Sequence, residues 1–109
     1  MTFNQYQTQS NKTAVYPDKG NNFIYPTLGL AGEAGEVADK IKKVLRDQNG
    51  IINNLTKKEI SKELGDVLWY VSQLATELNI SLDQIAEDNI KKLSSRQSRG
   101  VLTGSGDER

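Results

Sequence analysis

Two pairs of acidic residues occur at the same spacing in two parts of the chain. Glu33 and Glu36 form the first pair, Glu63 and Asp66 form the second, and each pair encloses a glycine. On an α-helix, residues three positions apart lie on one side. The first acid of each pair would therefore lie about 60°, and the second about 120°, from the apolar stripe of its helix. If the two helices pack through these stripes, the four carboxylates converge on one point.

A cluster of four carboxylates requires a cation or protonation. Two ionised carboxylates at about 4 Å repel each other by about 4 kcal/mol at an effective dielectric constant of about 20. The chain contains no histidine and no cysteine. A metal would therefore be held by oxygen atoms alone, which favours Mg²⁺, with Mn²⁺ as a substitute. Such a metal activates water and binds phosphate oxygens, so the acids indicate cleavage of a phosphate ester or anhydride, with one of them orienting or deprotonating the water.

Each pair also has a simpler interpretation. Acids three positions apart are common on solvated helix faces. Gly35 and Gly65 could serve only the close packing of helices, at about 1 kcal/mol of helix propensity each. The agreement between the two pairs in acids, glycine and neighbouring apolar residues favours a site.

The chain carries start and stop signals for four helices and no clear strand pattern, which predicts an all-α fold, a four-helix bundle. Three helices open with the spacing of a capping box, in which a Ser or Thr precedes a Glu or Gln by three positions. The residues that begin these boxes are Thr2, Thr56 and Ser81. We expect helices over residues 2–14, 27–47 with Gly50 as the stop, from 56 onward, and 81–97.

Apolar residues at helical spacing predict the buried faces. For the second helix these are Leu30, Ala34, Val37, Ile41 and Leu45. For the third they are Ile60, Leu64, Val67, Val71, Leu74, Ala75 and Leu78, and for the fourth Leu82, Ile85, Ile90 and Leu93.

Two segments outside the helices have distinct compositions. The loop of residues 16–26 has turn residues but also Tyr16, Phe23 and Tyr25, which would dock onto the bundle or offer a stacking surface for a flat ligand. Residues 98–109 are rich in Gly and Ser and are typical of a mobile tail.

The chain of 109 residues predicts a single domain, residues 1–109. Its 14 basic residues balance its 14 acidic ones, so it lacks the basic footprint of a nucleic-acid-binding protein. It has no apolar run near the roughly 20 residues that span a membrane and no signal-peptide pattern, so we expect no membrane contact and a cytoplasmic location. Only 36% of its residues are hydrophobic, so we expect another subunit to complete the core.

The residues around the acids are also distinctive. Residues 25–36, YPTLGLAGEAGE, and 62–70, KELGDVLWY, together with Asn89-x-x-Lys92 and Arg96, resemble the MazG-like group of all-α nucleoside triphosphate pyrophosphohydrolases. Residues 104–109, GSGDER, are similar to the tails of single-domain members. The resemblance extends over residues 24–109.

This resemblance implies a bundle that forms a homodimer or homotetramer and holds Mg²⁺ through the four acids. It implies hydrolysis of a nucleoside triphosphate to the monophosphate and pyrophosphate, often to clear non-standard or surplus nucleotides. It also implies phosphate contacts from Asn89, Lys92 and Arg96. Lys40 lies on the acid side of its helix and could reach a phosphate or pair with Glu36.

Two other functions stay open. A phosphoribosyl-ATP pyrophosphohydrolase or a dimeric dUTPase would apply the same metal chemistry to another substrate. A non-catalytic helical module would use the acids only to bind a metal or a basic partner. The base preference is undetermined, because base pockets in this group are built from variable loops and a partner subunit.

Trp69 lies about 180° from Ile60 on the helical wheel, opposite the expected core stripe. Burial of its large apolar area is worth about 2 to 3 kcal/mol, so we expect it in a subunit interface beside a composite active site. Packing under the loop of residues 16–26 and stacking on the substrate base are the alternatives. Phe23, Tyr25 and Tyr70 are candidates for the same base or interface role.

Overall fold

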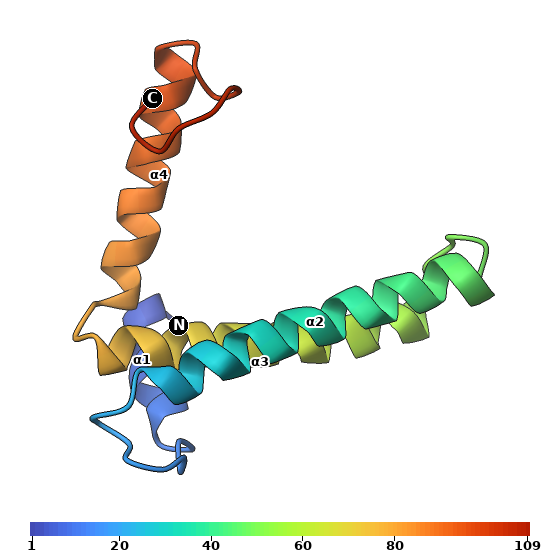
Figure 1. Cartoon of the computed structure of the whole chain (residues 1–109), viewed down its shortest axis with the longest axis horizontal. Helices are drawn as coiled ribbons and strands as arrows, with labels where there is room; N and C mark the ends of the chain where they lie inside the picture. Colours follow the sequence, from blue (N-terminus) through green and yellow to red (C-terminus); the bar gives the residue numbers. More distant parts are fainter.

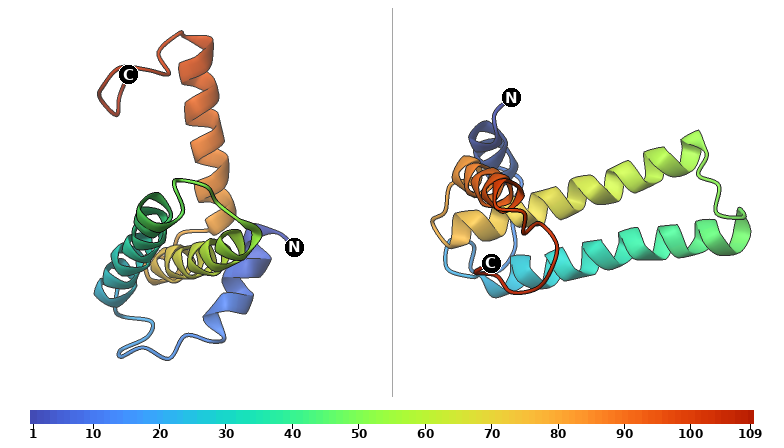
Figure 2. Two further views of the ribbon diagram at one scale, coloured as in Figure 1. Left: turned by 90° about the vertical axis from the view of Figure 1, so that its right-hand side faces the viewer. Right: turned by 90° about the horizontal axis from the view of Figure 1, so that it is seen from above.

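The computed structural model describes all 109 residues and contains four α-helices and no strand, which confirms the all-α prediction (Figure 1). The helices are α1 Phe3–Asn11, α2 Ile24–Asp47, α3 Asn54–Glu77 and α4 Leu82–Ser98. The two long helices, α2 and α3, lie side by side and antiparallel (Figure 2). α1 packs on α3, whereas α4 contacts α1 and rises away from the α2–α3 pair (Figure 1). None of the helices combines the length and the apolar character that a membrane crossing needs.

The start of α1 follows the predicted capping box. The Thr2 hydroxyl accepts a hydrogen bond from the Gln5 amide at 3.0 Å, and the Gln5 side chain accepts one from the Thr2 amide at 2.7 Å. The helix ends at Asn11, earlier than the predicted residue 14, because the amides of Thr13 and Ala14 bond to carbonyls three residues back and so form turns. The start of α4 is also as predicted, with the Ser81 hydroxyl accepting from the Gln84 amide at 3.3 Å.

The predicted start of α3 at Thr56 is wrong. Asn53 caps this helix, since its side-chain oxygen accepts from the Thr56 amide at 2.8 Å and from the Thr56 hydroxyl at 3.0 Å. Thr56 is therefore buried inside the first turn. α2 likewise begins before the predicted Thr27, because Pro26 fits the first turn of a helix, where no intrahelical amide bond is required. Its predicted stop is confirmed, with Gly50 at φ 74°.

The buried side of the α2–α3 pair differs from the predicted apolar stripes. On α2, Val44 is 3% exposed, whereas Ile41 and Leu45, which were expected to be buried, are 37% and 68% exposed. Ala34 of α2 and Leu64 and Leu78 of α3 are exposed as well. The reason is that each long helix has a second apolar side, which no other element of this chain covers.

α1 is attached to α3 largely through hydrogen bonds. Ser72 and Gln73 are completely buried, and the hydroxyls of Ser10 and Ser72 lie 2.8 Å apart. The Gln73 side-chain amide donates to Ser10 at 2.9 Å, and Asn11 donates to the Gln73 side-chain oxygen at 2.9 Å. Because a buried polar group without a partner is costly, this network fixes the register of α1 on α3.

Residues 99–109 fold back onto the end of α4, and the mobility expected of this tail stays a prediction. The side chain of Arg96 donates to the carbonyl of Asp107 at 2.6 Å. The guanidinium of Arg109 donates to three backbone carbonyls, those of Val101, Leu102 and Gly106. Arginine side chains therefore close this segment into a loop.

Candidate metal centre

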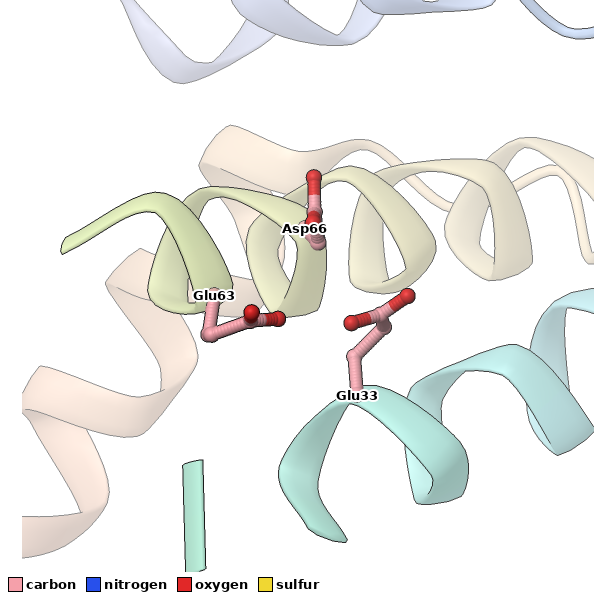
Figure 3. Close-up of side chains that lie close together, drawn as sticks. All are labelled: Glu33, Glu63 and Asp66. Carbon is pink, nitrogen blue, oxygen red and sulfur yellow. The ribbon is translucent and has the colours of Figure 1, made fainter. Parts of the chain in front are cut away.

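Three of the four predicted acids meet between α2 and α3. Glu33 approaches from α2, Glu63 and Asp66 from α3, and their carboxylate oxygens lie within 4.8 Å of one another (Figure 3). Glu33 and Glu63 are half-buried because they lie on the sides through which the two helices pack, whereas Asp66 is exposed at the edge. The antiparallel pairing of α2 and α3 thus produces the predicted convergence for these three residues.

Glu36 lies outside this group. It is exposed to solvent, one turn from Glu33 toward the edge of α2. Its charge still acts on the cluster, because it is one of the causes that raise the pKa of Glu33. A role of Glu36 in metal binding stays a prediction.

The electrostatics of the cluster favour a cation. Burial raises the pKa of Glu33 above its usual value, and a hydrogen bond with Glu63 and the negative charges of Asp66, Glu63 and Glu36 raise it further. The donor set consists only of carboxylate oxygens, which suits hard divalent ions such as Mg²⁺. The residues present therefore fit a magnesium ion, which would offset the repulsion among them.

Lys40 supplies a positive charge beside the acids. Its ammonium nitrogen lies 3.8 Å from a carboxylate oxygen of Glu63, and both side chains are largely shielded from solvent. The alternative partner considered from sequence, Glu36, is not the one in the structure, because Lys40 faces α3. Lys40 thus lies on one side of the acid cluster, toward the α2–α3 turn.

Aromatic side chains lie on the other side of the cluster. The ring of Tyr70 rests directly on Gly29, where a Cβ atom would overlap it. The rings of Tyr25 and Tyr16 are stacked, with centroids 5.1 Å apart and an interplanar angle of 11°. Phe23, just before α2, is 59% exposed.

The close-approach role assigned to Gly35 and Gly65 is wrong within this chain. A Cβ atom at either position would have no neighbour within 4 Å. Gly29 instead allows the close contact between α2 and α3, because the Tyr70 ring occupies the space of its missing side chain. Sequence reasoning missed Gly29, although it lies one turn before Glu33.

Trp69 packs within its own chain. Its indole nitrogen donates to the Thr13 hydroxyl at 2.8 Å, and its ring meets Tyr70 edge-on with centroids 5.0 Å apart. The side chain is half-buried. Thr13 lies just before the loop of residues 16–26, so this contact resembles the predicted alternative in which Trp69 packs under that loop. A role of the uncovered part of Trp69 in a subunit interface stays a prediction.

Glu77, which sequence reasoning also missed, holds the loop of residues 16–26. Its carboxylate accepts hydrogen bonds from the Tyr16 hydroxyl, from the Gly20 amide at 2.8 Å and from the Asn22 amide at 3.1 Å. Its spacing offered a signal, because Asp66, Tyr70, Gln73 and Glu77 follow one face of α3. Tyr6 of α1 was missed too, and both burial and the charge of Asp66 raise its pKa.

The predicted phosphate contacts on α4 lie away from the acids. Asn89 and Lys92 line a hollow of about 430 Å³ whose other lining residues are Ile80, Ile85 and Asp88. Arg96 is only 7% exposed and is bonded to the folded-back tail. Because α4 rises away from the α2–α3 pair (Figure 1), this chain alone does not bring them to the cluster.

The chain is 47% identical over 109 residues to the Gene 37 protein of Mycobacterium phage L5, covering 95% of this chain and 96% of that protein. No solved structure matches it. The family model of the MazG nucleotide pyrophosphohydrolase domain matches residues 26–101, which include the four acids of the predicted metal site and the whole of α4. The chain therefore belongs to the MazG nucleotide pyrophosphohydrolase family.

Proposed function

We propose that this protein is a metal-dependent nucleoside triphosphate pyrophosphohydrolase that converts a (d)NTP to the (d)NMP and pyrophosphate, using Mg²⁺ or, as a substitute, Mn²⁺. The observation that carries the proposal is the meeting of Glu33, Glu63 and Asp66 across α2 and α3. The membership of the chain in the MazG family supports the same reaction. Its role would be to clear non-standard or surplus nucleotides from the cytoplasmic pool.

In this proposal the acids bind the metal, with Glu36 reaching it from the edge of α2. Bound Mg²⁺ would supply Lewis-acid activation of water and neutralisation of phosphate charge. One of the carboxylates takes the proton from the water that attacks the α-phosphorus. A new oxygen–phosphorus bond forms, the bond between the α-phosphorus and the bridging oxygen breaks, and pyrophosphate leaves. Lys40, already 3.8 Å from Glu63, is placed to contact the departing phosphates.

The proposal includes a second copy of the chain, as a homodimer or homotetramer. Buried hydrophobic residues are few for a chain of this size, namely Ala14, Tyr16, Val44, Ala75 and Leu82. Many large apolar side chains of the long helices are exposed instead, among them Leu28, Ile41, Leu45, Leu55 and Leu64. Such a surface is expected to be covered, because exposing it to water is unfavourable.

A second copy would also bring Asn89 and Lys92 to the phosphates. Both residues line the hollow at the start of α4, away from the acids of their own chain. Packing of this face of α4 against the α2–α3 pair of another copy would place them beside its metal centre. The site would then combine acids from one chain with an amide and an ammonium group from the other.

The test is a panel of canonical and modified ribo- and deoxyribonucleoside triphosphates with Mg²⁺, with Mn²⁺ and with EDTA. We expect metal-dependent release of pyrophosphate and the matching monophosphate, and no activity in EDTA. The Asp66→Asn variant is the matched control for contaminating hydrolases. Release of phosphate instead of pyrophosphate, or full activity of Asp66→Asn, would overturn the proposal.

The same panel separates the alternatives. Turnover confined to phosphoribosyl-ATP or to dUTP would assign the chain to one of those related activities. A non-catalytic helical module would show no turnover with any nucleotide, yet Mg²⁺ would raise its melting temperature.

A further inference from the structure

Three arginines hold residues 99–109, which we call the arginine-closed loop, against the end of α4 that points away from the α2–α3 pair (Figure 1). They are Arg96, Arg99 and Arg109. Their guanidinium groups donate hydrogen bonds at 2.6 to 3.0 Å to five backbone carbonyls, those of Val101, Leu102, Gly106, Asp107 and Arg109. Charged side chains on the carbonyl side of the loop therefore set its conformation.

These hydrogen bonds also fix the direction of the backbone amides in the loop. In a trans peptide unit the carbonyl and the following N–H point to opposite sides. The amides that follow the bonded carbonyls therefore point away from the guanidinium groups, and they belong to Leu102, Thr103, Asp107 and Glu108. None of the amides of residues 102–109 donates to a backbone carbonyl of the chain, and residues 102–108 are exposed. The outer side of the loop thus presents a set of N–H donors.

The positive charge at the loop is only partly offset. None of the three arginines forms an ion pair, since their partners are neutral carbonyls and, for Arg99, also the Ser95 hydroxyl. Arg96 is only 7% exposed, and a buried charge in a protein normally has a partner of opposite charge. The acids of the loop, Asp107 and Glu108, are exposed and fewer than the arginines. Excess positive charge and outward N–H donors together favour the binding of an anion.

Two glycines keep the backbone donors accessible. Gly104 and Gly106 have φ values of 107° and 95°, in the left-handed region that favours glycine. Because neither position has a side chain, an anion can approach the neighbouring amides closely. Arg99 and Arg109 donate two and three of the five N–H groups that a guanidinium carries, which leaves donors for an anion.

We propose that the arginine-closed loop is a binding site for phosphate-type anions, namely pyrophosphate or the terminal phosphates of a nucleotide. Backbone amides around Gly104 and Gly106 donate to the phosphate oxygens, and Arg99 and Arg109 add charge-assisted hydrogen bonds. The choice of phosphate among anions rests on the proposed function, in which a triphosphate is consumed and pyrophosphate is released. The loop is separate from the acids of its own chain, because it lies at the far end of α4 (Figure 1).

The first experiment titrates the full chain, in EDTA, with sodium pyrophosphate and follows the backbone amides by ¹H–¹⁵N NMR. Without metal, the carboxylates of the acid cluster repel the anion. We expect saturable shifts of the amides of residues 102–108, with an affinity that falls as KCl is added, because salt screens exposed charges. Inorganic phosphate should shift the same amides at higher concentration.

Variants separate anion binding from the folding of the loop. Arg99→Gln and Arg109→Gln should each raise the Kd for pyrophosphate about tenfold, because each removes a charged donor. Asp107→Asn removes a repelling charge and keeps the bonded carbonyl, so it should lower the Kd by about two- to fivefold. Lys57→Gln, exposed at the start of α3, has the same charge change as the arginine variants and should leave the Kd within about twofold of the wild type.

Steady-state kinetics distinguish the two sources of the anion. If the loop meets the triphosphate of a substrate, Arg99→Gln should raise KM for the nucleotide and leave kcat unchanged. If the loop retains the released product, the same variant should weaken inhibition by pyrophosphate and leave KM unchanged. Either result supports the inference.

Three results would overturn the inference. The first is a titration in which pyrophosphate shifts none of the loop amides. The second is an equal Kd for the wild type, Arg99→Gln and Arg109→Gln. The third is loss of binding in Lys92→Gln alone, because the anion would then occupy the hollow at the start of α4. Absence of turnover with every nucleotide would overturn the proposed function instead, and the titration would still decide whether the loop binds pyrophosphate.

Discussion

The carboxylates of Glu33 and Glu63 face each other across the line along which α2 and α3 pack, and both are half-buried there (Figure 3). Two acids at the contact between helices oppose the association of those helices unless a cation or a proton lies between them. The α2–α3 pair is therefore expected to depend on metal for part of its stability as well as for catalysis.

Substitution of the acids should separate catalysis from folding. We expect Glu36→Gln and Asp66→Asn each to lower turnover at least a hundredfold, because each removes a ligand charge and keeps the side-chain shape. Glu59→Gln, one turn before Glu63 and exposed, is the control and should keep normal turnover. The measurements are kcat with saturating Mg²⁺ and helix content. Near-normal activity of both variants would contradict the metal assignment.

The raised pKa of Glu33 predicts how the stability of the metal-free protein depends on pH. Its pKa is raised above the usual 4.5, so the folded state holds this proton more tightly than the unfolded state does. The resulting stability is fully present below pH 4.5 and is lost as pH rises through the folded pKa. In EDTA, the melting temperature of Glu33→Gln should therefore exceed that of the wild type at pH 7. Addition of Mg²⁺ should reverse this order, and an unchanged order would refute the prediction.

The lowered pKa of Glu77 predicts that its contribution to stability depends on pH in the opposite direction. Burial alone would raise its pKa, but hydrogen bonds from Tyr16 and from the amides of Gly20 and Asn22 lower it below 4.5. This stabilisation is present above pH 4.5 and is lost as pH falls through the folded pKa. We expect Glu77→Gln to reduce the free energy of unfolding by about 1 kcal/mol at pH 7. The reduction should shrink in acid.

Denaturant unfolding at pH 7 and in acid measures this effect. Glu87→Gln, on the exposed side of α4, is the control and should change stability by less than about 0.5 kcal/mol. Equal effects of the two substitutions would show that Glu77 does not hold the loop.

Lys92 and Arg96 lie one turn apart, but we expect their substitution to affect the stability of the protein differently. Lys92 is exposed, so Lys92→Ala should lower kcat/KM for nucleotide with little change in stability or in Mg²⁺ affinity without substrate. Arg96 is buried against the Asp107 carbonyl, so Arg96→Ala should in addition cost about 1 to 3 kcal/mol of stability. Lys91→Ala is the neighbouring control. Ordinary kinetics in both variants would remove these residues from the site.

Substitution of Trp69 tests the predicted subunit interface. If its uncovered part lies between subunits, Trp69→Ala should shift the protein toward monomer in sedimentation, with activity lost in step. Thr13→Val removes the 2.8 Å hydrogen bond from the indole and the bond from the Thr13 hydroxyl to the Ser10 carbonyl but keeps the Trp69 ring, so it should leave the oligomer intact. A fully oligomeric Trp69→Ala with altered nucleotide selectivity would indicate base stacking instead.

The sequence by itself determined the four helices and the positions of the acids along them. Capping at Thr2 and Ser81 and the stop at Gly50 were predictable because these signals act over three or four residues. Asn53 displaced Thr56 as the cap of α3 because both residue types satisfy the same local pattern and only one can occupy the position.

Only the tertiary structure decided which side of each helix meets another. The sequence predicted one buried stripe on each of α2 and α3, but each helix has a second apolar side, and only one line of contact between the two helices is buried. That line passes through Glu33, Glu63 and Gly29, leaving Glu36 at the edge and Leu45 in solvent. The contact of the Tyr70 ring with Gly29 joins two residues that are 41 positions apart in the sequence. The hydrogen bonds of Glu77 to the loop join residues that are 55 or more positions apart. No local sequence signal acts over such separations.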